Sequence, residues 1–258
     1  MSERIHFDNI KIEDGVYILS QINSAFESSY LKIREKEKRI YNDEELKTLP
    51  YASDSNLHKQ EWHLRTKSFQ RFKKYLNEIE NNLNVLDLGS GNGWFSGQLS
   101  KTFNHNFYCV DVNLSELKQG RRVFDSNNLC FLYADIFSEE FSEKYFDIII
   151  VNAAVQYFRD LENLINRLLS LLSENGEIHI IDSPFYTGNE VNNARKRTAE
   201  YFTVLGFPEM TKNYFHHSWD RLSDYDLEII YEPKSISKKF KRVLFIKDSP
   251  FPWIKISR

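Results

Sequence analysis

The sequence predicts an α/β domain: a doubly wound sheet of seven strands, mostly parallel with a C-terminal antiparallel strand, preceded by an N-terminal helical extension. Three observations predict it. From residue 83 onward, short apolar runs alternate with helical patterns, as in a parallel sheet covered on both faces. Four of the nine glycines fall between residues 89 and 97, directly after the first predicted strand. The 258 residues suffice for one such core and an extension.

The N-terminal part of the chain lacks this alternation. Residues 26–41 form a charge-rich helical stretch, a pattern typical of a solvated helix face. A second helix, from 62 to 79, places Phe69, Phe72 and Leu76 on one side and leads into the first strand. No Pro-rich linker separates the two parts. We therefore expect residues 1–60 to form a helical extension or lid, and residues 61–258 to form the main domain.

The remaining elements follow from apolar spacing. The predicted strands are residues 84–88, 107–111, 129–133, 146–152 and 177–181, and the predicted helices between them are residues 95–103, 114–124 and 161–172. The last helix carries leucine and isoleucine residues three and four positions apart, which form one buried stripe. Near the C-terminus, residues 227–231 and 243–246 flank a basic segment, 234–242. These two runs are expected to form an antiparallel pair that closes the sheet.

Composition limits the possible partners. Lys and Arg number 34 against 37 Asp and Glu, a net charge of -3, so no overall field attracts nucleic acid or anionic lipid. No run approaches the roughly 18 apolar residues of a membrane span. The chain starts without a secretory pattern and contains only two cysteines, Cys109 and Cys130, so we expect a cytoplasmic, thiol-reduced protein. A small molecule is the expected partner.

The glycine cluster has the layout of a ligand-binding turn. A buried strand ends at Leu88, the turn contains Gly89, Gly91 and Gly93, and a helix follows. In a doubly wound sheet, this arrangement places a ligand at the carboxyl end of the strand, against the N–H groups of the next helix. A P-loop is excluded because no Lys-Ser/Thr pair follows. A dinucleotide site is disfavoured because Trp94 occupies the position that a small residue needs.

A third class of cofactor fits the turn better. The pattern Asp87-x-Gly89-x-Gly91-x-Gly93 resembles motif I of class I S-adenosylmethionine-dependent methyltransferases, and the resemblance extends over roughly residues 83–246. It implies the class I methyltransferase fold, with S-adenosylmethionine as the cofactor. It also implies cofactor contacts from the turn itself, namely Asp87, Gly89, Ser90, Gly91, Asn92 and Gly93.

Two later acids agree with this resemblance. Asp111 ends the second predicted strand and is followed by Val112; an acid there accepts hydrogen bonds from both ribose hydroxyls. Asp135 and Ile136 follow the third strand, where an acid or amide of the family contacts the adenine amino group. Each acid has an alternative. Asp111 could cap the following helix, and Asp135 could be an ordinary exposed loop carboxylate.

Two further positions are candidates for cofactor binding. Asn152 ends the fourth strand, where Ala153 and Ala154 depart from the Asn/Asp-Pro-Pro-Tyr pattern of enzymes that methylate adenine or glutamine nitrogen. That departure disfavours methylation of either group. Upstream, related methyltransferases often place an arginine or aromatic residue near the cofactor carboxylate. The corresponding candidates are Arg65 and Trp62.

The segment after the fifth strand supplies candidate catalytic residues. An insertion at this point commonly forms part of the acceptor lid in the enzymes that the chain resembles. Here it contains Tyr186, His216 and His217. Either histidine is a candidate general base, because its ordinary pKa is about 6.5, and the alternative is that both are ordinary surface residues. We expect no metal, because adjacent histidines point in different directions and no cysteine supports them.

These observations favour one function over two others. The favoured function is transfer of a methyl group from S-adenosylmethionine to a small-molecule acceptor, with oxygen preferred over nitrogen or carbon. The second is methylation of RNA or protein, which the acidic net charge disfavours and only the basic segment 234–242 supports. The third is a non-catalytic domain that binds S-adenosylmethionine. No residue in the sequence is an unambiguous catalyst, so this third hypothesis stays open.

Overall fold

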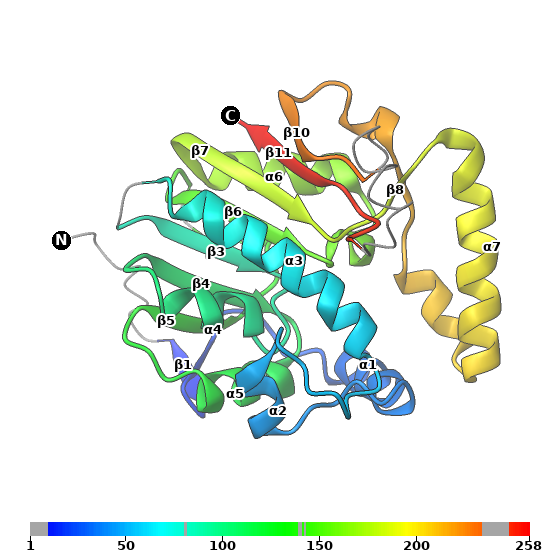
Figure 1. Ribbon diagram of the computed structural model, residues 1–258, viewed down its shortest axis with the longest axis horizontal. Helices are drawn as coiled ribbons and strands as arrows, with labels where there is room; N and C mark the ends of the chain where they lie inside the picture. The colour runs from blue at the N-terminus through cyan, green and yellow to red at the C-terminus, as the bar shows by residue number, and fades with distance from the viewer. Residues whose placement is uncertain (1–9, 80–81, 139–140, 142, 234–247) are drawn as a thin grey trace.

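The computed structural model describes residues 10–79, 82–138, 141, 143–233 and 248–258 (Figure 1). Its centre is a nine-stranded sheet with the order β1-β2-β5-β4-β3-β6-β7-β11-β10. The strands are β1 (Lys11–Glu13), β2 (Val16–Ile18), β3 (Asn84–Leu88), β4 (Asn106–Asp111), β5 (Leu129–Tyr133), β6 (Phe146–Asn152), β7 (Leu172–Ile181), β10 (Leu227–Tyr231) and β11 (Trp253–Ser257). A separate short pair joins β8 (Phe185–Tyr186) to β9 (His217–Ser218).

The strands from β2 to β7 in this order are parallel to their neighbours, and β11 is antiparallel to both β7 and β10. The register aligns Asp87 of β3 with Cys109 of β4 and with Ile150 of β6. The carboxyl ends of the parallel strands therefore meet at one edge of the sheet. In Figure 1 their arrowheads point toward the side on which α1 and α7 lie. This edge is where ligands bind in doubly wound sheets.

The helices are α1 (Ser24–Lys36), α2 (Asp43–Thr48), α3 (Lys59–Leu76), α4 (Trp94–Ser100), α5 (Leu114–Val123), α6 (Leu161–Leu171) and α7 (Gly188–Leu205), and the 3-10 turns are η1 (Val155–Tyr157), η2 (Pro208–Asn213) and η3 (Trp219–Leu222). Side chains cap several of these helix starts, among them that of α2, where Asn42 accepts a hydrogen bond from Glu45 N. Asn113 accepts a hydrogen bond from Glu116 N at the start of α5, and Asp160 accepts one from Asn163 N at the start of α6.

Two hydrophobic cores cover the two faces of the sheet. Helices α3, α4 and α5 share one core with alternate strand residues, and α6 shares the other with the residues between them. The first core includes Phe69, Phe72, Phe95, Leu99, Leu117, Val85, Phe107 and Phe131. The second includes Leu161, Leu164, Ile165, Leu168, Leu86, Leu88, Val110 and Ile149. This alternation confirms the predicted doubly wound sheet, because each buried strand supplies both cores from one apolar run.

The N-terminal segment differs from the helical extension that the sequence predicts. Before α1, strands β1 and β2 form a hairpin around Asp14 and Gly15, both with positive φ. Strand β2 then pairs in parallel with β5. Two strands from the extension thus join the sheet, and neither is among the strands that the sequence predicts. Val16, Tyr41 and Leu46 belong to the first core, so this segment packs directly against the main domain.

The antiparallel closure also differs in its partner strand. Strand β10 is found where it is expected, but within the described residues it pairs with β11, so that Leu227 lies opposite Ile256. The expected partner, residues 243–246, lies outside the described residues, as does the whole of the basic segment 234–242. The chain after the two prolines at 250 and 252 therefore supplies the central antiparallel strand.

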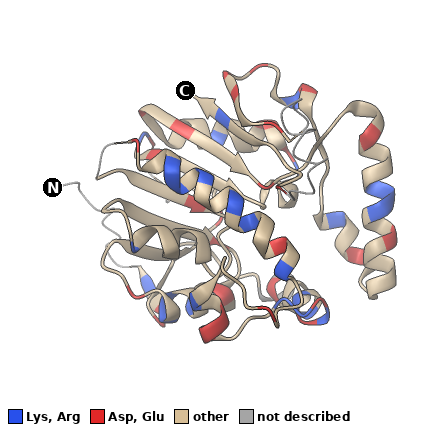
Figure 2. Ribbon diagram, viewed as in Figure 1, with Lys and Arg blue, Asp and Glu red and all other residues tan. Residues whose placement is uncertain are grey.

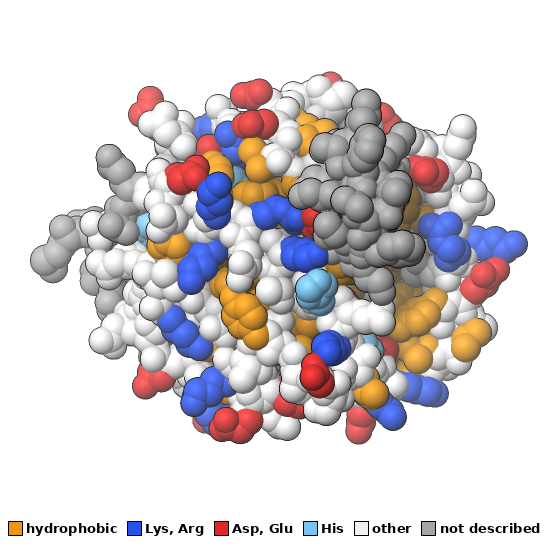
Figure 3. Space-filling model, viewed as in Figure 1, with side chains coloured by type: hydrophobic (Ala, Val, Ile, Leu, Met, Phe, Trp, Pro, Cys, Tyr) orange, Lys and Arg blue, Asp and Glu red, His pale blue; other side chains and the backbone are white. Residues whose placement is uncertain are grey.

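The most evident series of basic side chains follows one helix. Lys and Arg residues follow the length of α3 (Figure 2), and on the face shown in Figure 3 they are separated by uncharged and apolar side chains. Among the described residues, no helix combines the length and apolar character that crossing a membrane requires.

Candidate active site

The glycine turn leaves β3 with its backbone in the left-handed region. Gly89, Gly91 and Gly93 have φ values of 70°, 55° and 67°. A Cβ atom on Gly89 would lie 2.5 Å from the Cβ of Ala154, and one on Gly91 would lie 3.2 Å from Oε2 of Glu116. The turn therefore needs glycine both for its conformation and for its close packing. This explains why glycine gathers here in a chain that otherwise contains few.

Asp87 stabilises the glycine turn through a hydrogen bond to α4. It lies near the end of β3 with 1% of its surface exposed, and its Oδ2 accepts a hydrogen bond of 2.7 Å from Ser96 Oγ of α4. Burial raises the pKa of Asp87 to about 6, against the opposing effect of the Ser96 hydrogen bonds. The carboxylate links the strand to the helix on either side of the turn.

Asp111 is bonded to the same turn from the neighbouring strand. Its Oδ2 accepts Gly91 N–H at 2.7 Å, and its Oδ1 accepts Asn113 N–H at 2.9 Å. Burial raises the pKa of Asp111, while the backbone N–H groups of Gly91 and Asn113 act in the opposite direction. The carboxylate thus holds together the turn after β3 and the start of the loop before α5.

A first cavity of about 240 Å³ opens above these strand ends. Eleven of the twelve predicted cofactor-binding residues line it: Arg65, Asp87, Gly89, Ser90, Gly91, Asn92, Asp111, Val112, Asp135, Ile136 and Asn152. The twelfth, Gly93, does not. A Cβ atom on Gly93 would lie 2.6 Å from the ring of Phe131, so this glycine lets the start of α4 pack on the sheet.

Asn152 contributes an unpaired polar atom to this cavity. The side-chain Oδ1 is buried and has no hydrogen-bond partner among the described residues. The next residue, Ala153, has a φ of 52°, which is strained for a residue with a Cβ. Its N–H donates to Ile181 O at 2.8 Å. The chain therefore turns sharply at the end of β6, and Asn152 is left with an acceptor that a ligand can satisfy.

Glu116 is a cavity residue that the sequence does not single out. It comes from the first turn of α5 and accepts a hydrogen bond from Asn113 Nδ2 at 3.0 Å. Burial raises the pKa of Glu116 to about 7, with Arg34 opposing the rise. Glu116 lies beside Gly91 because of the way α5 packs against the turn. Helical periodicity alone predicts an ordinary solvated acid at this position.

A second cavity of about 680 Å³ adjoins the first. Its walls come from α1, α3, α7 and the segments after β7 and before η3. Seven residues line both cavities, and we call them the shared boundary: Tyr30, Arg34, Arg39, Glu61, Arg65, Ala153 and Tyr157. A molecule in the second cavity would meet a ligand in the first across these side chains.

The shared boundary contains three arginines and one glutamate. Arg39 donates two hydrogen bonds to the carboxylate of Glu61, at 3.1 and 2.6 Å, and Arg65 Nε donates a third at 3.0 Å. Burial acts to raise the pKa of Glu61, but the hydrogen bonds and charges of the two arginines outweigh it and lower the pKa to about 2. Arg34 donates from Nε to the hydroxyl oxygen of Tyr30 at 2.8 Å.

Aromatic rings form much of the second cavity. Tyr157 meets Tyr30 edge to face at a centroid distance of 6.1 Å, and it meets Tyr214 at 5.9 Å. From α7, the hydroxyl of Tyr201 donates to the carboxylate of Glu37 near the end of α1. This contact joins the two helices across the cavity mouth. The volume of about 680 Å³ lies in the range of small-molecule binding pockets.

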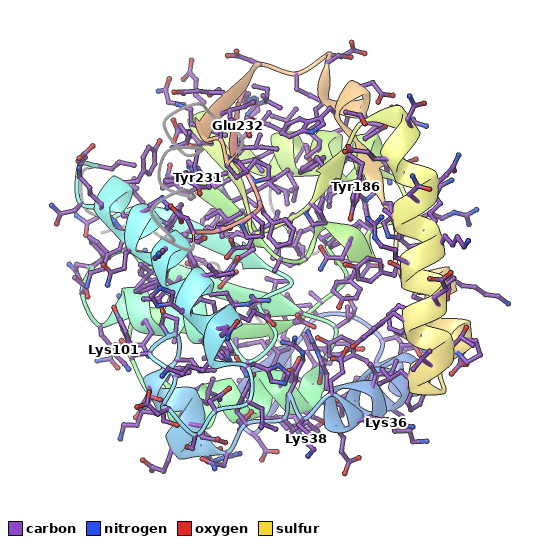
Figure 4. All side chains as sticks on the ribbon, turned by 45° about the vertical axis from the view of Figure 1, so that its right-hand side comes forward. Lys36, Lys38, Lys101, Tyr186, Tyr231 and Glu232 are labelled. Carbon is purple, nitrogen blue, oxygen red and sulfur yellow. The ribbon has the colours of Figure 1, made fainter. Side chains whose placement is uncertain are left out.

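The three predicted catalytic residues occupy different positions. Tyr186 lines the second cavity and lies beside α7 (Figure 4). His216 and His217 are buried and line neither cavity. His217 Nε2 lies 3.2 Å from Val155 O, and His216 Nε2 lies 2.9 Å from Thr198 Oγ1. The histidines therefore pack behind the cavity wall, and the geometry does not favour either as a general base.

Burial also affects the charge of these histidines. It lowers the pKa of His216 to about 4, and the positive charges of Arg195 and Arg197 act in the same direction. Burial likewise lowers the pKa of His217. In the part of the chain that the structure describes, no three His, Cys, Asp or Glu side chains gather closely enough to hold a metal ion.

Comparison with known proteins identifies the family of the chain. The family model described as "Methyltransferase domain" matches residues 79–243, more than half of the chain. A malonyl-[acyl-carrier protein] O-methyltransferase from Acetivibrio thermocellus is 30% identical over 100 residues, which are 38% of this chain and 35% of the relative. The chain spans about a third of the length of the first curated relatives that it matches.

A longer but weaker match exists to a phosphoethanolamine N-methyltransferase from Plasmodium falciparum. That protein is 25% identical over 234 residues, covering 81% of this chain and 84% of the relative.

Solved structures share the fold at low sequence identity. A putative sarcosine dimethylglycine methyltransferase from Galdieria sulphuraria has a TM-score of 0.57 and 12% identity, covering 89% of this chain and 97% of its own. A geranyl diphosphate C-methyltransferase from Streptomyces coelicolor A3(2), solved with S-adenosyl-L-homocysteine, has a TM-score of 0.53 and 12% identity, covering 80% and 81%. Together, the family match and the shared sheet show that the chain belongs to the methyltransferase domain family and has the class I methyltransferase fold.

Proposed function

We propose that this protein transfers a methyl group from S-adenosylmethionine to a small-molecule acceptor, with oxygen as the accepting atom. One observation carries the proposal. The first cavity, at the strand ends of a methyltransferase fold, adjoins a larger second cavity, and the two have the residues of the shared boundary in common. A transferase needs two adjoining sites of this kind, because donor and acceptor must meet in line while water is kept away.

The chemistry of the first cavity fits the cofactor. Gly89 and Gly91 line the cavity and give the turn its left-handed backbone conformation, so that main-chain atoms of the turn border the ligand space. Asp111 has the position from which a carboxylate accepts both ribose hydroxyls. Asn152 Oδ1 is a buried acceptor that the methionine amino group would satisfy. When bound, S-adenosylmethionine supplies an activated methyl group on a positively charged sulfur.

The other residues of the cavity would orient the cofactor. Arg65, with a guanidinium that is bonded only through Nε among the described residues, is suited to the methionine carboxylate. Asp135 and Ile136 follow β5 and would contact the adenine. Asp135 Oδ1 accepts Phe137 N–H at 3.0 Å, which leaves its other oxygen available to an amino group. Asp87 would act indirectly, by holding the turn through Ser96.

Oxygen is the preferred acceptor atom on two grounds. The segment after β6 is Asn152-Ala153-Ala154, which departs from the pattern of enzymes that methylate adenine or glutamine nitrogen. One curated relative is named as an O-methyltransferase and another as an N-methyltransferase, so the relatives alone support either atom. The cationic side chains at the shared boundary favour an oxygen nucleophile over an ammonium group.

The experiment is a calorimetric titration followed by an acceptor screen. We expect S-adenosylmethionine and S-adenosylhomocysteine to bind with micromolar dissociation constants. Small-molecule extracts incubated with protein and S-adenosylmethionine should then yield species heavier by one methylene. If neither cofactor form binds, the proposed function is wrong. If both bind but RNA or protein is the methylated fraction, or nothing is methylated, the small-molecule assignment fails.

A further inference from the structure

The arginines of the shared boundary are not equally engaged. Two guanidinium nitrogens of Arg39 donate hydrogen bonds to the carboxylate of Glu61. Arg65 shares that same carboxylate and, under the proposed function, also holds the methionine carboxylate. Arg34 has no comparable partner: Nε is bonded to the Tyr30 hydroxyl, and Nη1 lies 3.4 Å from a Glu37 oxygen.

Glu37 also interacts with two other side chains. It also accepts the Tyr201 hydroxyl and lies 3.5 Å from Arg39 Nε. Among the described residues, Nη2 of Arg34 donates no hydrogen bond. A guanidinium with an open edge, only 28% exposed and facing both cavities, is a binding position for an anionic group.

The side chains around Arg34 indicate what kind of body a bound anion would carry. Its guanidinium carbon lies 4.9 Å from the centroid of the Tyr30 ring, and that ring meets Tyr157, which meets Tyr214. These rings form one continuous aromatic wall that runs from the shared boundary into the second cavity. A ligand held by Arg34 would therefore extend an apolar or ring-containing body along this wall.

The shared boundary lacks a base that would deprotonate a neutral nucleophile. Its one carboxylate, Glu61, has a pKa of about 2, and burial raises the pKa of the Tyr30 hydroxyl well above its usual value. Glu116, with a pKa of about 7, lines only the first cavity, and His216 and His217 line neither. Within the shared boundary an alcohol would therefore meet no group suited to accept its proton; the other carboxylates of the second cavity, Glu37 and Asp182, lie outside this boundary. A nucleophile that is already anionic needs none.

We propose that the acceptor is a small carboxylic acid with an apolar body, bound through its carboxylate to Arg34 and methylated on a carboxylate oxygen. This inference rests on the proposed function and narrows its substrate class. The carboxylate oxygen supplies the electron pair for the new O–CH₃ bond, and the pair of the broken C–S bond returns to sulfur. The products are a methyl ester and neutral S-adenosylhomocysteine, and no proton is released.

Binding to the S-adenosylhomocysteine-saturated protein tests the assignment without requiring turnover. The probes are phenylacetate, its neutral analogue phenylacetamide, and benzylphosphonate, each titrated by calorimetry. We expect phenylacetate to bind about tenfold tighter than phenylacetamide. Arg34→Gln should remove that preference, and Arg34→Lys should restore part of it, because lysine keeps the charge but loses the planar fork. The control is Arg121→Gln, which removes an arginine paired with Asp125 outside both cavities.

A second readout identifies the product. With S-adenosylmethionine labelled in its methyl group and a mixture of small acids, the transferred label should leave as methanol after mild alkali, as methyl esters do. Label that resists alkali would overturn the inference.

The remaining outcomes separate this inference from the proposed function. Equal binding of phenylacetate and phenylacetamide, absence of binding by both, or preference for benzylphosphonate would also overturn the inference. If Arg34→Gln kept the preference for the carboxylate, Arg34 would not be the residue that binds it. In each of these cases S-adenosylhomocysteine still binds, so the proposed function survives. Failure of S-adenosylhomocysteine itself to bind would instead reject the proposed function.

Discussion

The two cavities are built in different ways. The first rests on consecutive loops at the ends of parallel strands, and its principal groups are a glycine turn and carboxylates that are bonded to backbone N–H groups. The second is assembled from helices that are distant in sequence, and its principal groups are arginine and tyrosine side chains. The contact from Tyr201 to Glu37 joins residues 164 positions apart.

This difference predicts where substitutions act. Backbone geometry sets the first cavity, so a substitution there should act on cofactor affinity through conformation as well as contact. Side-chain packing sets the second, so a substitution there should act on the acceptor and leave the cofactor alone. The expected effects are largest at the glycine turn and smallest at the helix contact.

Gly91→Val should give the largest effect. The φ of 55° is unfavourable for a β-branched residue, and the new Cβ would lie 3.2 Å from Glu116 Oε2. We expect S-adenosylhomocysteine affinity to fall by at least about 100-fold in calorimetry. Gly188→Val is the matched control, because a Cβ there meets nothing within 4 Å. Wild-type affinity in Gly91→Val would contradict the placement of the cofactor against the turn.

Asp111→Ala should be next. The variant loses the proposed ribose contacts and the bonds to Gly91 and Asn113. Cofactor affinity is expected to fall by ~1.5 to 3 kcal/mol, the scale of lost charge-assisted hydrogen bonds. Asp125→Ala, at an exposed ion pair with Arg121, is the control. An unchanged dissociation constant in Asp111→Ala would reject the ribose assignment.

Asp87 should make stability depend on pH. Its folded-state pKa of about 6 exceeds the ordinary value of 3.8, so its protonated form favours folding. That stabilisation is complete below about pH 4 and is lost as pH rises through 6, by on the order of 3 kcal/mol. Urea unfolding from pH 4.5 to 7.5 should show wild type losing stability relative to Asp87→Asn. Parallel pH profiles for the two proteins would count against the buried, ionisable carboxylate.

Tyr201→Phe should give the smallest effect and the sharpest contrast between the cavities. It removes the hydroxyl that joins α7 to Glu37 and leaves the ring in place. We expect acceptor affinity to weaken about two- to fivefold, as for one lost hydrogen bond, and cofactor affinity to stay the same. Titration of both ligands measures this. An equal loss for both would show that the two cavities are not independent.

The same difference explains which parts of the site the sequence could predict. The sequence predicts the positions of Asp87, Gly91 and Asp111, because a strand, a turn and a helix start fix them locally. The position of Glu116 is not predictable in this way, because it depends on how α5 packs against the turn. His216 and His217 mislead in the opposite sense: a polar pair in a lid-like segment looks available, but packing buries both.

The fold shows the same limit at its edges. The central strands were predictable from long apolar runs, whereas β1 and β2 contain three residues each. A local signal for them existed, since Asp14-Gly15 is a favoured hairpin turn and lies between short alternating apolar residues. The strand β11 follows two prolines, which favour a loop, and its pairing with β7 is a long-range contact that periodicity does not reveal.

A crystal structure with S-adenosylhomocysteine tests the central claim most directly. The account predicts the nucleoside in the first cavity, its ribose hydroxyls bonded to Asp111, and its sulfur directed toward the shared boundary with the second cavity. A first cavity that stays empty in the complex, or a ribose held by residues other than Asp111, would contradict it.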